Sequence, residues 1–253
     1  MKILSVANQK GGVGKSTLTA HLAYAALEAG QRVLLVDMDK QGNLSLTFAV
    51  ENATPGLVAS QLFYQQTNEL QPQLVADRLG LIRADNGLLA IDRAENEVIR
   101  VPGQSLRKFA QDFDLCLIDT PPLLGIRLLA AMSASDYVVT PVAVGLYELS
   151  GLADLLQSIQ VVRTQGFNPR LKHIGILPMK TNSRSSEEQE GLDALRARYG
   201  TAILPEELPE RFPVRRAVAN RRPVWVSTKG AGHIKAAQEW RAACESILRR
   251  IGQ

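Results

Sequence analysis

A short glycine-rich stretch near the start of the chain decides its fold: Lys10-Gly11-Gly12-Val13-Gly14-Lys15-Ser16-Thr17. It follows an apolar run with strand character at Lys2–Ala7, and it precedes apolar residues at helical spacing from Ser16 to Ala29. A strand, a glycine loop and a helix in this order can hold phosphate groups. The glycines let successive backbone N–H groups turn inward, and the start of the helix adds a positive partial charge. The stretch therefore predicts a nucleotide-binding site.

Within this loop, Lys15 is expected to reach the β- and γ-phosphates of a nucleotide, and the Ser16 hydroxyl is expected to bind Mg²⁺. The common phosphate-loop pattern begins with glycine, but Gln9 occupies that position here, and a lysine, Lys10, precedes the glycines. The alternative is a glycine-rich turn that carries a lysine by chance. The predicted nucleotide-binding residues of the loop are Gly11, Gly12, Val13, Gly14, Lys15, Ser16 and Thr17.

Three aspartates follow apolar runs of strand character, where a metal or a reactive water would be held. Asp119 ends the run Leu115–Ile118, and Asp37 and Asp39 lie at the end of the run Arg32–Asp37 and just beyond it. Asp119 is predicted to support Mg²⁺. Of Asp37 and Asp39, one is expected to support the metal and the other to orient the attacking water. The alternative is that aspartates at strand ends cap the following turn.

Continuous apolar runs recur along the chain and alternate with helical stretches, which predicts strands buried on both faces of a parallel sheet. We expect an α/β fold of the P-loop NTPase type, a single doubly wound, mostly parallel sheet flanked by helices, in one domain over residues 1–253. The segment 52–68 has the least pattern and is expected to be a surface excursion. The further runs are Val33–Val36, Tyr137–Thr140 and Ile174–Leu177, and the helical stretches include Leu149–Thr164, Glu187–Tyr199 and Ala231–Ile251.

The composition narrows the class of protein. The chain has 253 residues, of which 45% are hydrophobic and 21% are charged, so it is long and apolar enough to bury a core. No apolar run approaches the roughly 18 residues that a membrane-spanning helix needs. Cys116 and Cys244 have no metal-ligand spacing and are expected to be core residues in a reducing compartment. These features predict a cytoplasmic protein.

Charge is distributed unevenly along the chain. Residues 1–150 carry a net charge of −3, whereas residues 211–253 hold 10 basic and 2 acidic side chains. Such a basic C-terminal segment suggests a polyanionic partner. The alternative is a solvated face whose arginines pair with acidic side chains such as Glu206, Glu207 and Glu210.

Three motifs together resemble the ParA/MinD family of deviant Walker A ATPases, and the likeness is greatest to its small ParA-type DNA-partition members. The resemblance covers nearly the whole chain. Lys40 departs from it, because the family usually has proline at that position. The motifs are the opening segment 8–17 (NQKGGVGKST), the segment 36–43 (VDMDKQGN), which resembles switch I, and the segment 118–122 (IDTPP), which resembles the Walker B and switch II region.

The resemblance implies an ATP-dependent homodimer that uses Mg²⁺ and hydrolyses ATP slowly until a ParB-like adaptor protein stimulates it. Lys10 matches the signature lysine, which reaches the phosphates of the partner subunit. Asp39 matches the aspartate that positions the hydrolytic water, so the catalytic residues are expected to be Lys10, Lys15 and Asp39. Asn182 follows a late strand and is expected to contact the adenine base.

The same resemblance implies that the ATP-loaded dimer binds DNA without sequence preference and associates with the nucleoid. The main alternative is a MinD-like positioning ATPase that binds membranes through a C-terminal amphipathic helix, with apolar residues from Ile234 to Ile251. A non-enzymatic, nucleotide-gated DNA-binding module is a further alternative. The predicted DNA-binding residues are Arg215, Arg216, Arg221, Arg222, Lys229 and Lys235.

Overall fold

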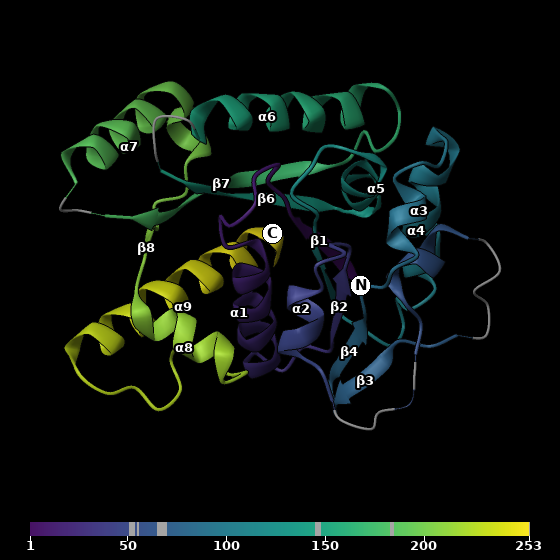
Figure 1. Cartoon of the computed structure of the whole chain (residues 1–253), viewed down its shortest axis with the longest axis horizontal. Helices are drawn as coiled ribbons and strands as arrows, with labels where there is room; N and C mark the ends of the chain where they lie inside the picture. Colours follow the sequence, from purple (N-terminus) through teal and green to yellow (C-terminus); the bar gives the residue numbers. More distant parts are fainter. Residues whose placement is uncertain (51–53, 55, 65–69, 145–147, 183–184, 253) are drawn as a thin grey trace.

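Eight strands form one sheet in the part of the chain that the structure describes (Figure 1). The computed structural model describes residues 1–50, 54, 56–64, 70–144, 148–182 and 185–252. The strands are β1 (Lys2–Val6), β2 (Val33–Asp37), β3 (Gln73–Ala76), β4 (Leu79–Ile82), β5 (Leu115–Asp119), β6 (Tyr137–Ala143), β7 (Lys172–Thr181) and β8 (Leu208–Pro209).

The strand order is β3-β4-β2-β5-β1-β6-β7-β8, and every neighbouring pair is parallel except β3 and β4. The central strands β1, β2 and β5 consist almost wholly of buried residues, as expected for strands covered on both faces. The register pairs the last residue of β2, Asp37, with the last residue of β5, Asp119. The prediction of a doubly wound, mostly parallel sheet is confirmed.

Helices cover both faces of the sheet (Figure 1). One face carries α1, α2, α8 and α9, and the other carries α3 to α7. The helices are α1 (Lys15–Glu28), α2 (Asn43–Thr47), α3 (Leu88–Ile91), α4 (Val101–Arg107), α5 (Ile126–Ala134), α6 (Glu148–Thr164), α7 (Ser186–Tyr199), α8 (Phe212–Ala219) and α9 (Ala231–Gly252), with 3-10 segments η1 (Ala59–Phe63), η2 (Asn96–Arg100) and η3 (Gly200–Ala202).

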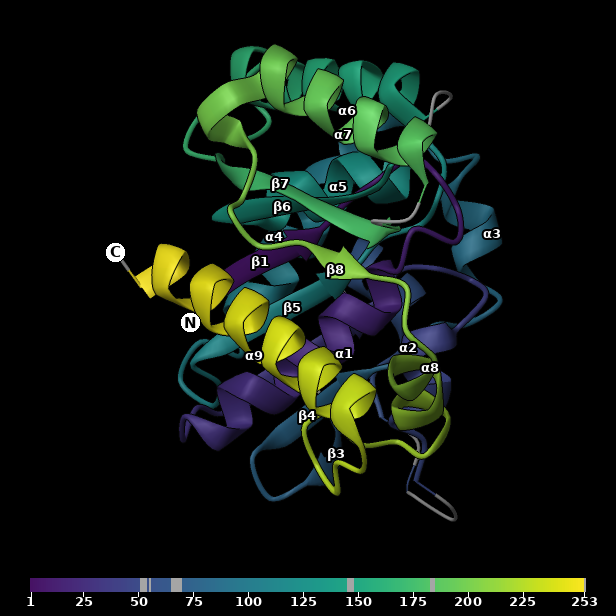
Figure 2. The ribbon, with the colours of Figure 1, turned by 90° about the vertical axis from the view of Figure 1, so that its left-hand side faces the viewer.

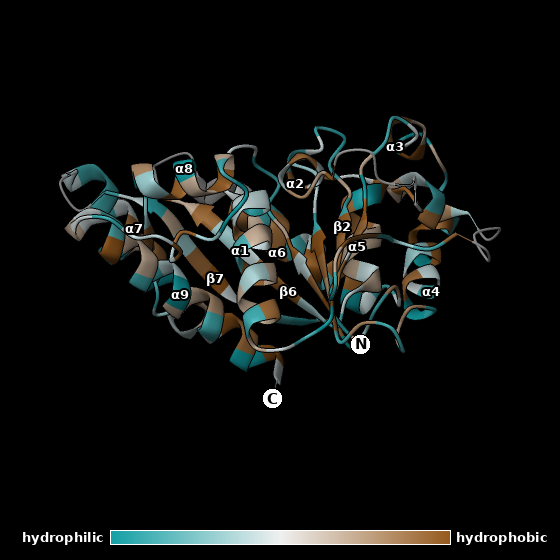
Figure 3. Cartoon of the chain, turned by 90° about the horizontal axis from the view of Figure 1, so that it is seen from below, coloured by the Kyte–Doolittle hydropathy of each residue, from teal (hydrophilic) through white to brown (hydrophobic). Residues whose placement is uncertain are grey.

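The hydrophobic core lies on the two faces of the sheet. Figure 3 shows hydrophobic colour concentrated along the central strands and hydrophilic colour on the outer sides of the helices. Cys116 and Cys244 are fully buried in this core, and burial raises the pKa of both thiols. The expectation that they are core residues is therefore confirmed.

The long C-terminal helix α9 packs against α1 and crosses it on the same face of the sheet (Figure 2). Trp240, Cys244 and Ile247 of α9 are buried between the helix and the sheet. Ile234, expected on the same apolar side, is instead 47% exposed, because the first turn of α9 extends beyond the core. Among the described residues, no helix is long and apolar enough to cross a membrane.

The weakly patterned segment after α2 differs from the expected surface excursion. Of residues 52–68, positions 52, 53, 55 and 65–68 lie outside the described residues. Leu57, Leu62 and Phe63 are almost fully buried and join the core under α4 and α5. Leu62 and Phe63 lie in the 3-10 segment η1, and Leu57 precedes it. A short 3-10 segment has neither the apolar spacing of a strand nor that of an α-helix, so the sequence pattern does not reveal these buried residues.

Candidate functional site

The glycine loop connects β1 to α1, and two of its glycines adopt conformations that other residues avoid. Gly12 has φ +74° and Gly14 has φ +102°. Gly14 also lies against β7, since a Cβ added to it would come within 2.8 Å of the Met179 Cε. The backbone of this loop therefore depends on glycine at positions 12 and 14.

We expect Gly14→Ala to lower ATP affinity by about tenfold or more and to reduce the melting temperature. An L-residue at positive φ costs about 1–2 kcal/mol, and the end of the Met179 side chain would also have to move to make room for the added methyl group. Isothermal titration with ATP and thermal melting measure both effects. Gly232→Ala is the matched control, because Gly232 lies in α9 with open space around its Cβ position. Equal ATP affinity of Gly14→Ala and the wild type would contradict the assigned loop geometry.

Lys15 begins α1 and is almost fully buried. Its Nζ donates a hydrogen bond to the carbonyl oxygen of Lys10 at 2.9 Å, so the ammonium group reaches back across the loop. Burial lowers the pKa of Lys15, while the nearby carboxylates of Asp119 and Asp39 act in the opposite direction. A buried cation at this place can bind a phosphate oxygen with little reorganisation.

Asp119 is completely buried at the end of β5, facing the start of α1. Burial, followed by repulsion from Asp37, raises its pKa to about 8, and the nearby Ser16 and Lys15 offset part of this effect. Ser16 lies near the Asp119 carboxylate. Among the described residues, however, neither Asp119 oxygen has a hydrogen-bond partner of standard geometry. An unpartnered buried carboxylate is an unusual feature and suits a group that binds a cation.

The two aspartates of switch I have different surroundings. Asp37 is fully buried and accepts hydrogen bonds from the Ser45 backbone N–H at 2.8 Å, from the Ser45 hydroxyl at 2.7 Å and from the Asp39 N–H at 3.1 Å. Burial raises the pKa of Asp37 to about 6 in spite of these bonds. Asp39 accepts a hydrogen bond from the Gln41 N–H at 3.0 Å and lines the cleft described below. Asp37 thus anchors the turn before α2, in agreement with the capping alternative, and Asp39 faces the cleft.

The oxygen atoms of Ser16 and Asp119 suit a magnesium ion that is bound together with a nucleotide. Among the described residues there is no cluster of three or more acidic, histidine or cysteine side chains that could hold a metal unaided. Mg²⁺ usually binds through one or two protein oxygens, substrate phosphates and several waters. The Ser16 hydroxyl and the unpartnered Asp119 carboxylate supply such oxygens beside the phosphate loop.

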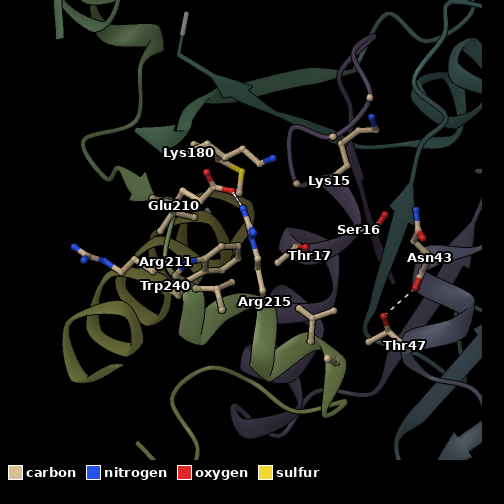
Figure 4. Close-up of a pocket in the computed structure, with 18 of the residues that line it drawn as sticks. Lys15, Ser16, Thr17, Asn43, Thr47, Lys180, Glu210, Arg211, Arg215 and Trp240 are labelled. Carbon is tan, nitrogen blue, oxygen red and sulfur yellow. Dashed lines mark hydrogen bonds and ion pairs between the residues drawn. The ribbon is translucent and has the colours of Figure 1, made fainter. Parts of the chain in front are cut away.

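A cleft of about 770 Å³ opens next to the loop. Thr17 and Ser16 of α1 form one wall, and α8 with the segment after β8 forms the wall opposite (Figure 4). Arg215 crosses toward Glu210, with which it forms an ion pair, and Trp240 lies behind them. Further lining residues from switch I, α2 and the end of β7 are Gln41, Asn43, Leu46, Thr47, Met179 and Lys180.

Three residues predicted to act on the nucleotide, Lys10, Val13 and Asn182, do not line this cleft. Lys10 packs its side chain against α6, where a Cβ added to Gly151 would lie 3.1 Å from the Lys10 Cε. Asn182 is exposed one residue beyond β7, whereas its neighbours Met179 and Lys180 reach the cleft. Their roles toward a partner subunit and an adenine base remain predictions. Val13 is buried within the loop.

The predicted DNA-binding residues lie in different places. Arg215 and Arg221 line the nucleotide cleft, and the Arg221 Nη1 also donates to the Ala49 carbonyl oxygen at 2.8 Å. Lys235 is exposed on α9. A second cavity of about 760 Å³, on the other side of α8, is lined by Arg216, Arg222 and Lys229.

The acidic residues expected to neutralise the arginines do so only in part. Glu210 pairs with Arg215, which lowers the pKa of Glu210, but Glu207 pairs with Arg196 of α7. Within the described ranges, Arg216, Arg222, Lys229 and Lys235 form no ion pair. Arg216, Arg222 and Lys229, which line the second cavity, are therefore open to an anionic partner, whereas Arg211 beside them is paired with Glu239.

The sequence did not point to the cleft wall made by β8 and α8. Strand β8 has two residues, and its residues Leu208 and Pro209 line the cleft together with Val214 and Trp240. Two residues are too few for a periodic signal, and Trp240 lies far along the chain in α9. Only the pairing of β8 with β7 places this wall beside the loop.

Comparisons with known proteins identify the family. A family model described as an AAA domain matches residues 1–173. The chain is 35% identical to Protein IncC of Escherichia coli over 255 residues, covering 99% of this chain and 70% of that protein. It is 32% identical to the chromosome-partitioning ATPase Soj of Thermus thermophilus over 255 residues, covering 98% of this chain and 96% of Soj.

A solved structure shares the fold of this chain. A crystal structure of cobyrinic acid a,c-diamide synthase from Mycobacterium smegmatis with bound ADP and magnesium superposes with a TM-score of 0.80 at 26% identity, covering 100% of this chain and 96% of that one. That protein therefore binds a nucleotide and magnesium on the same fold. With the variant phosphate loop, the buried Asp119 and the match to Soj over nearly the whole chain, these findings show that the chain belongs to the ParA/MinD family of deviant Walker A ATPases.

Proposed function

We propose that this protein is a ParA-type ATPase that partitions DNA, as a homodimer that closes on Mg-ATP and holds non-specific DNA. The similarity to Soj, which is named a chromosome-partitioning ATPase, supports the activity, and the cations Arg216, Arg222 and Lys229 at the second cavity support the DNA surface. That cavity is the observation that carries the proposal, because three of its basic side chains, Arg216, Arg222 and Lys229, do not line the nucleotide cleft.

In this proposal, the loop N–H groups and the Lys15 ammonium bind the nucleotide phosphates, and the Ser16 and Asp119 oxygens hold Mg²⁺. A bound Mg²⁺ neutralises charge on the β- and γ-phosphates. Asp39 lies on the cleft surface with one oxygen bonded to the Gln41 N–H, so its other oxygen can orient a water toward the γ-phosphate. Lys10 reaches the partner subunit's nucleotide and stabilises the developing charge.

The dimer is a timed switch in this proposal. ATP bridges two subunits only when they are closed, so it shifts the population toward the closed dimer by its differential affinity for the two states. Closure brings two copies of the basic surface together, and the paired surfaces bind DNA far more tightly than one. A ParB-like adaptor accelerates a slow basal hydrolysis, after which the dimer opens, so the protein associates with the nucleoid in the cytoplasm only while it is loaded with ATP.

The DNA surface is tested by reversing charge on one side of α8. We expect Arg222→Glu with Lys229→Glu to lower ATP-dependent affinity for non-specific duplex DNA by tenfold or more. Each lost contact between a cation and a phosphate releases about one counterion fewer from the DNA. Because the variant loses two such contacts, the plot of log affinity against log salt concentration should become less steep by about 2. Binding is measured with ATP, ADP and no nucleotide across a salt series.

Arg249→Glu with Arg250→Glu is the matched control, since both arginines are exposed at the far end of α9 and the charge change is identical. A reduction of DNA affinity that is equal in the two double variants would show that total charge, and not the second cavity, governs binding. ATP affinity should be unchanged in both.

A MinD-like membrane role is less well supported. Its membrane anchor would be α9, but Trp240, Cys244, Ile247 and Ile251 of that helix are buried against α1 and the sheet. Sedimentation with anionic liposomes in the presence of ATP separates the two functions, because a helix docked in this way exposes little apolar surface to lipid. Strong ATP-dependent sedimentation together with no DNA binding would favour the membrane role.

A further inference from the structure

The basic loop, which we define as residues 220–230, connects α8 to α9 and carries Arg221, Arg222 and Lys229. Two of its non-glycine residues, Arg221 and Ser227, have φ of 52° and 53°, a conformation that needs support from neighbouring structure. The loop is attached to the rest of the protein at Val224, which is fully buried. Both backbone polar groups of Val224 are bonded to histidine side chains.

His21 of α1 makes the first of these contacts. Its Nδ1 lies 2.8 Å from the carbonyl oxygen of Thr17, and its Nε2 lies 3.2 Å from the backbone nitrogen of Val224. A carbonyl oxygen can only accept and a backbone N–H can only donate, so these partners require a neutral ring with the proton on Nδ1. His21 thus joins a residue of the phosphate loop to the middle of the basic loop.

His233 of α9 makes the second contact with the opposite tautomer. Its Nδ1 accepts from the Lys229 N–H at 3.1 Å, and its Nε2 donates to the Val224 carbonyl oxygen at 2.8 Å. Lys229 is one of the cations that line the second cavity. The same histidine therefore holds the buried centre of the basic loop and one of its exposed cations.

The packing around His21 reinforces this arrangement. The His21 ring lies 4.4 Å from the Trp240 ring and 5.5 Å from the Trp225 ring, measured between centroids. The Trp225 Nε1 donates a 2.7 Å hydrogen bond to Glu28, the last residue of α1. The basic loop is therefore hydrogen-bonded to α1 at two positions, His21 and Glu28. Burial lowers the pKa of His21 to about 4, which keeps the ring neutral and its Nε2 free to accept.

We propose that His21 and His233 form a clamp on Val224 that holds the basic loop in the position DNA binding requires and couples it to the nucleotide-binding end of α1. The chain has three histidines in all, and two of them serve this one residue. A neutral imidazole suits the task because it carries one donor and one acceptor at opposite sides of a rigid ring. Both histidines act as positioning residues, and the inference rests on the proposed DNA-binding function.

Variants that keep or remove the hydrogen bond to Val224 test the clamp. His21→Met and His233→Leu remove it at similar side-chain volume, while His21→Gln offers an acceptor and His233→Gln offers a donor at a similar reach. Trypsin cleavage after Lys229, followed by mass spectrometry, reports the order of the basic loop. We expect cleavage to rise about five- to tenfold in the two apolar variants, with a similar reduction of ATP-dependent DNA affinity, and to stay within about twofold of wild type in the glutamine variants.

The effect of ATP on tryptic cleavage after Lys229 tests the coupling to the nucleotide, because a histidine that only fills space in the core would not transmit ATP binding to the basic loop. ATP is expected to slow cleavage after Lys229 in the wild type and to have no effect on it in His21→Met. Equal protection by ATP in both proteins would overturn the coupling, and glutamine variants as impaired as the apolar ones would overturn the hydrogen-bond clamp. Since His21 is fully buried, His233→Leu carries the test if His21→Met does not fold.

Failure of the clamp and failure of the DNA function give different results. Normal DNA binding and normal tryptic protection in His21→Met and His233→Leu, together with loss of DNA binding in Arg222→Glu with Lys229→Glu, would overturn the clamp and leave the function intact. Unchanged DNA binding in the charge-reversed variant would overturn the function, and tryptic cleavage alone would then decide whether the clamp orders the loop.

Discussion

Lys15→Ala is expected to weaken ATP binding by about 100-fold or more. The Lys15 ammonium is buried beside the loop, and its Nζ is already directed across it to the Lys10 carbonyl oxygen. Hydrogen bonds to charged groups contribute about 1.5–3 kcal/mol each, so two charged contacts to phosphate oxygens amount to about two to four powers of ten in affinity. Equilibrium titration with a fluorescent ATP analogue measures the change.

The matched control for this variant is Lys172→Ala. Lys172 is an exposed lysine at the start of β7, whereas the loop follows the end of β1, so the two lie at opposite ends of the parallel strands. Lys172→Ala should remain folded because Lys172 is exposed. Lys15→Ala removes the cost of burying an ammonium group but also takes a cation away from the buried Asp119, so thermal melting checks its folding before the titration. An unchanged ATP affinity for a folded Lys15→Ala protein would contradict the assignment of residues 11–17 as the phosphate site.

Asp39→Ala is expected to lower the rate of ATP hydrolysis by about 100- to 1,000-fold and to change ATP affinity by less than about threefold. Asp39 lines the cleft, and its carboxylate is held by the neighbouring Gln41 N–H, so its removal takes away an acceptor for water and disturbs little else. Reductions of this size are typical when a group that acts mainly in the transition state is removed. Phosphate release under single-turnover conditions measures the rate.

Asp37→Ala separates this catalytic role from a structural one. Asp37 accepts three hydrogen bonds that hold the start of α2 and the switch I turn, so its removal leaves buried donors unpaired. We expect Asp37→Ala to lower the melting temperature clearly and Asp39→Ala to change it little. Normal hydrolysis by Asp39→Ala would show that another group orients the water.

Elements with a strong local pattern are predictable from the sequence. The loop, α1, the central strands and α9 all lie within a few residues of their expected bounds, because each has a periodic apolar pattern or a required glycine. The sequence does not predict β3, β4 and β8, which have two to four residues each. Strands this short are stabilised by their neighbours in the sheet, so their own residues carry little signal.

The division of the arginines is not predictable from the sequence. Arg215 and Arg216 are adjacent in sequence, and neighbours on a helix point about 100° apart, so one lines the nucleotide cleft and the other the second cavity. Arg211 lies in the same basic segment but forms two 2.7 Å hydrogen bonds to Glu239, 28 residues away. Counting charge treats these side chains alike, whereas their partners depend on the packing of α8 against α9.

The phosphate loop, the strand-and-helix alternation and the family can be read from the sequence, because these depend on residues close together in the chain. The tertiary structure alone decided that Asp37 anchors a turn while Asp119 is left without a partner among the described residues, and that two distant histidines meet at Val224. Hydrogen bonds and burial between distant segments exist only once the sheet and its covering helices are assembled, so no local pattern encodes them.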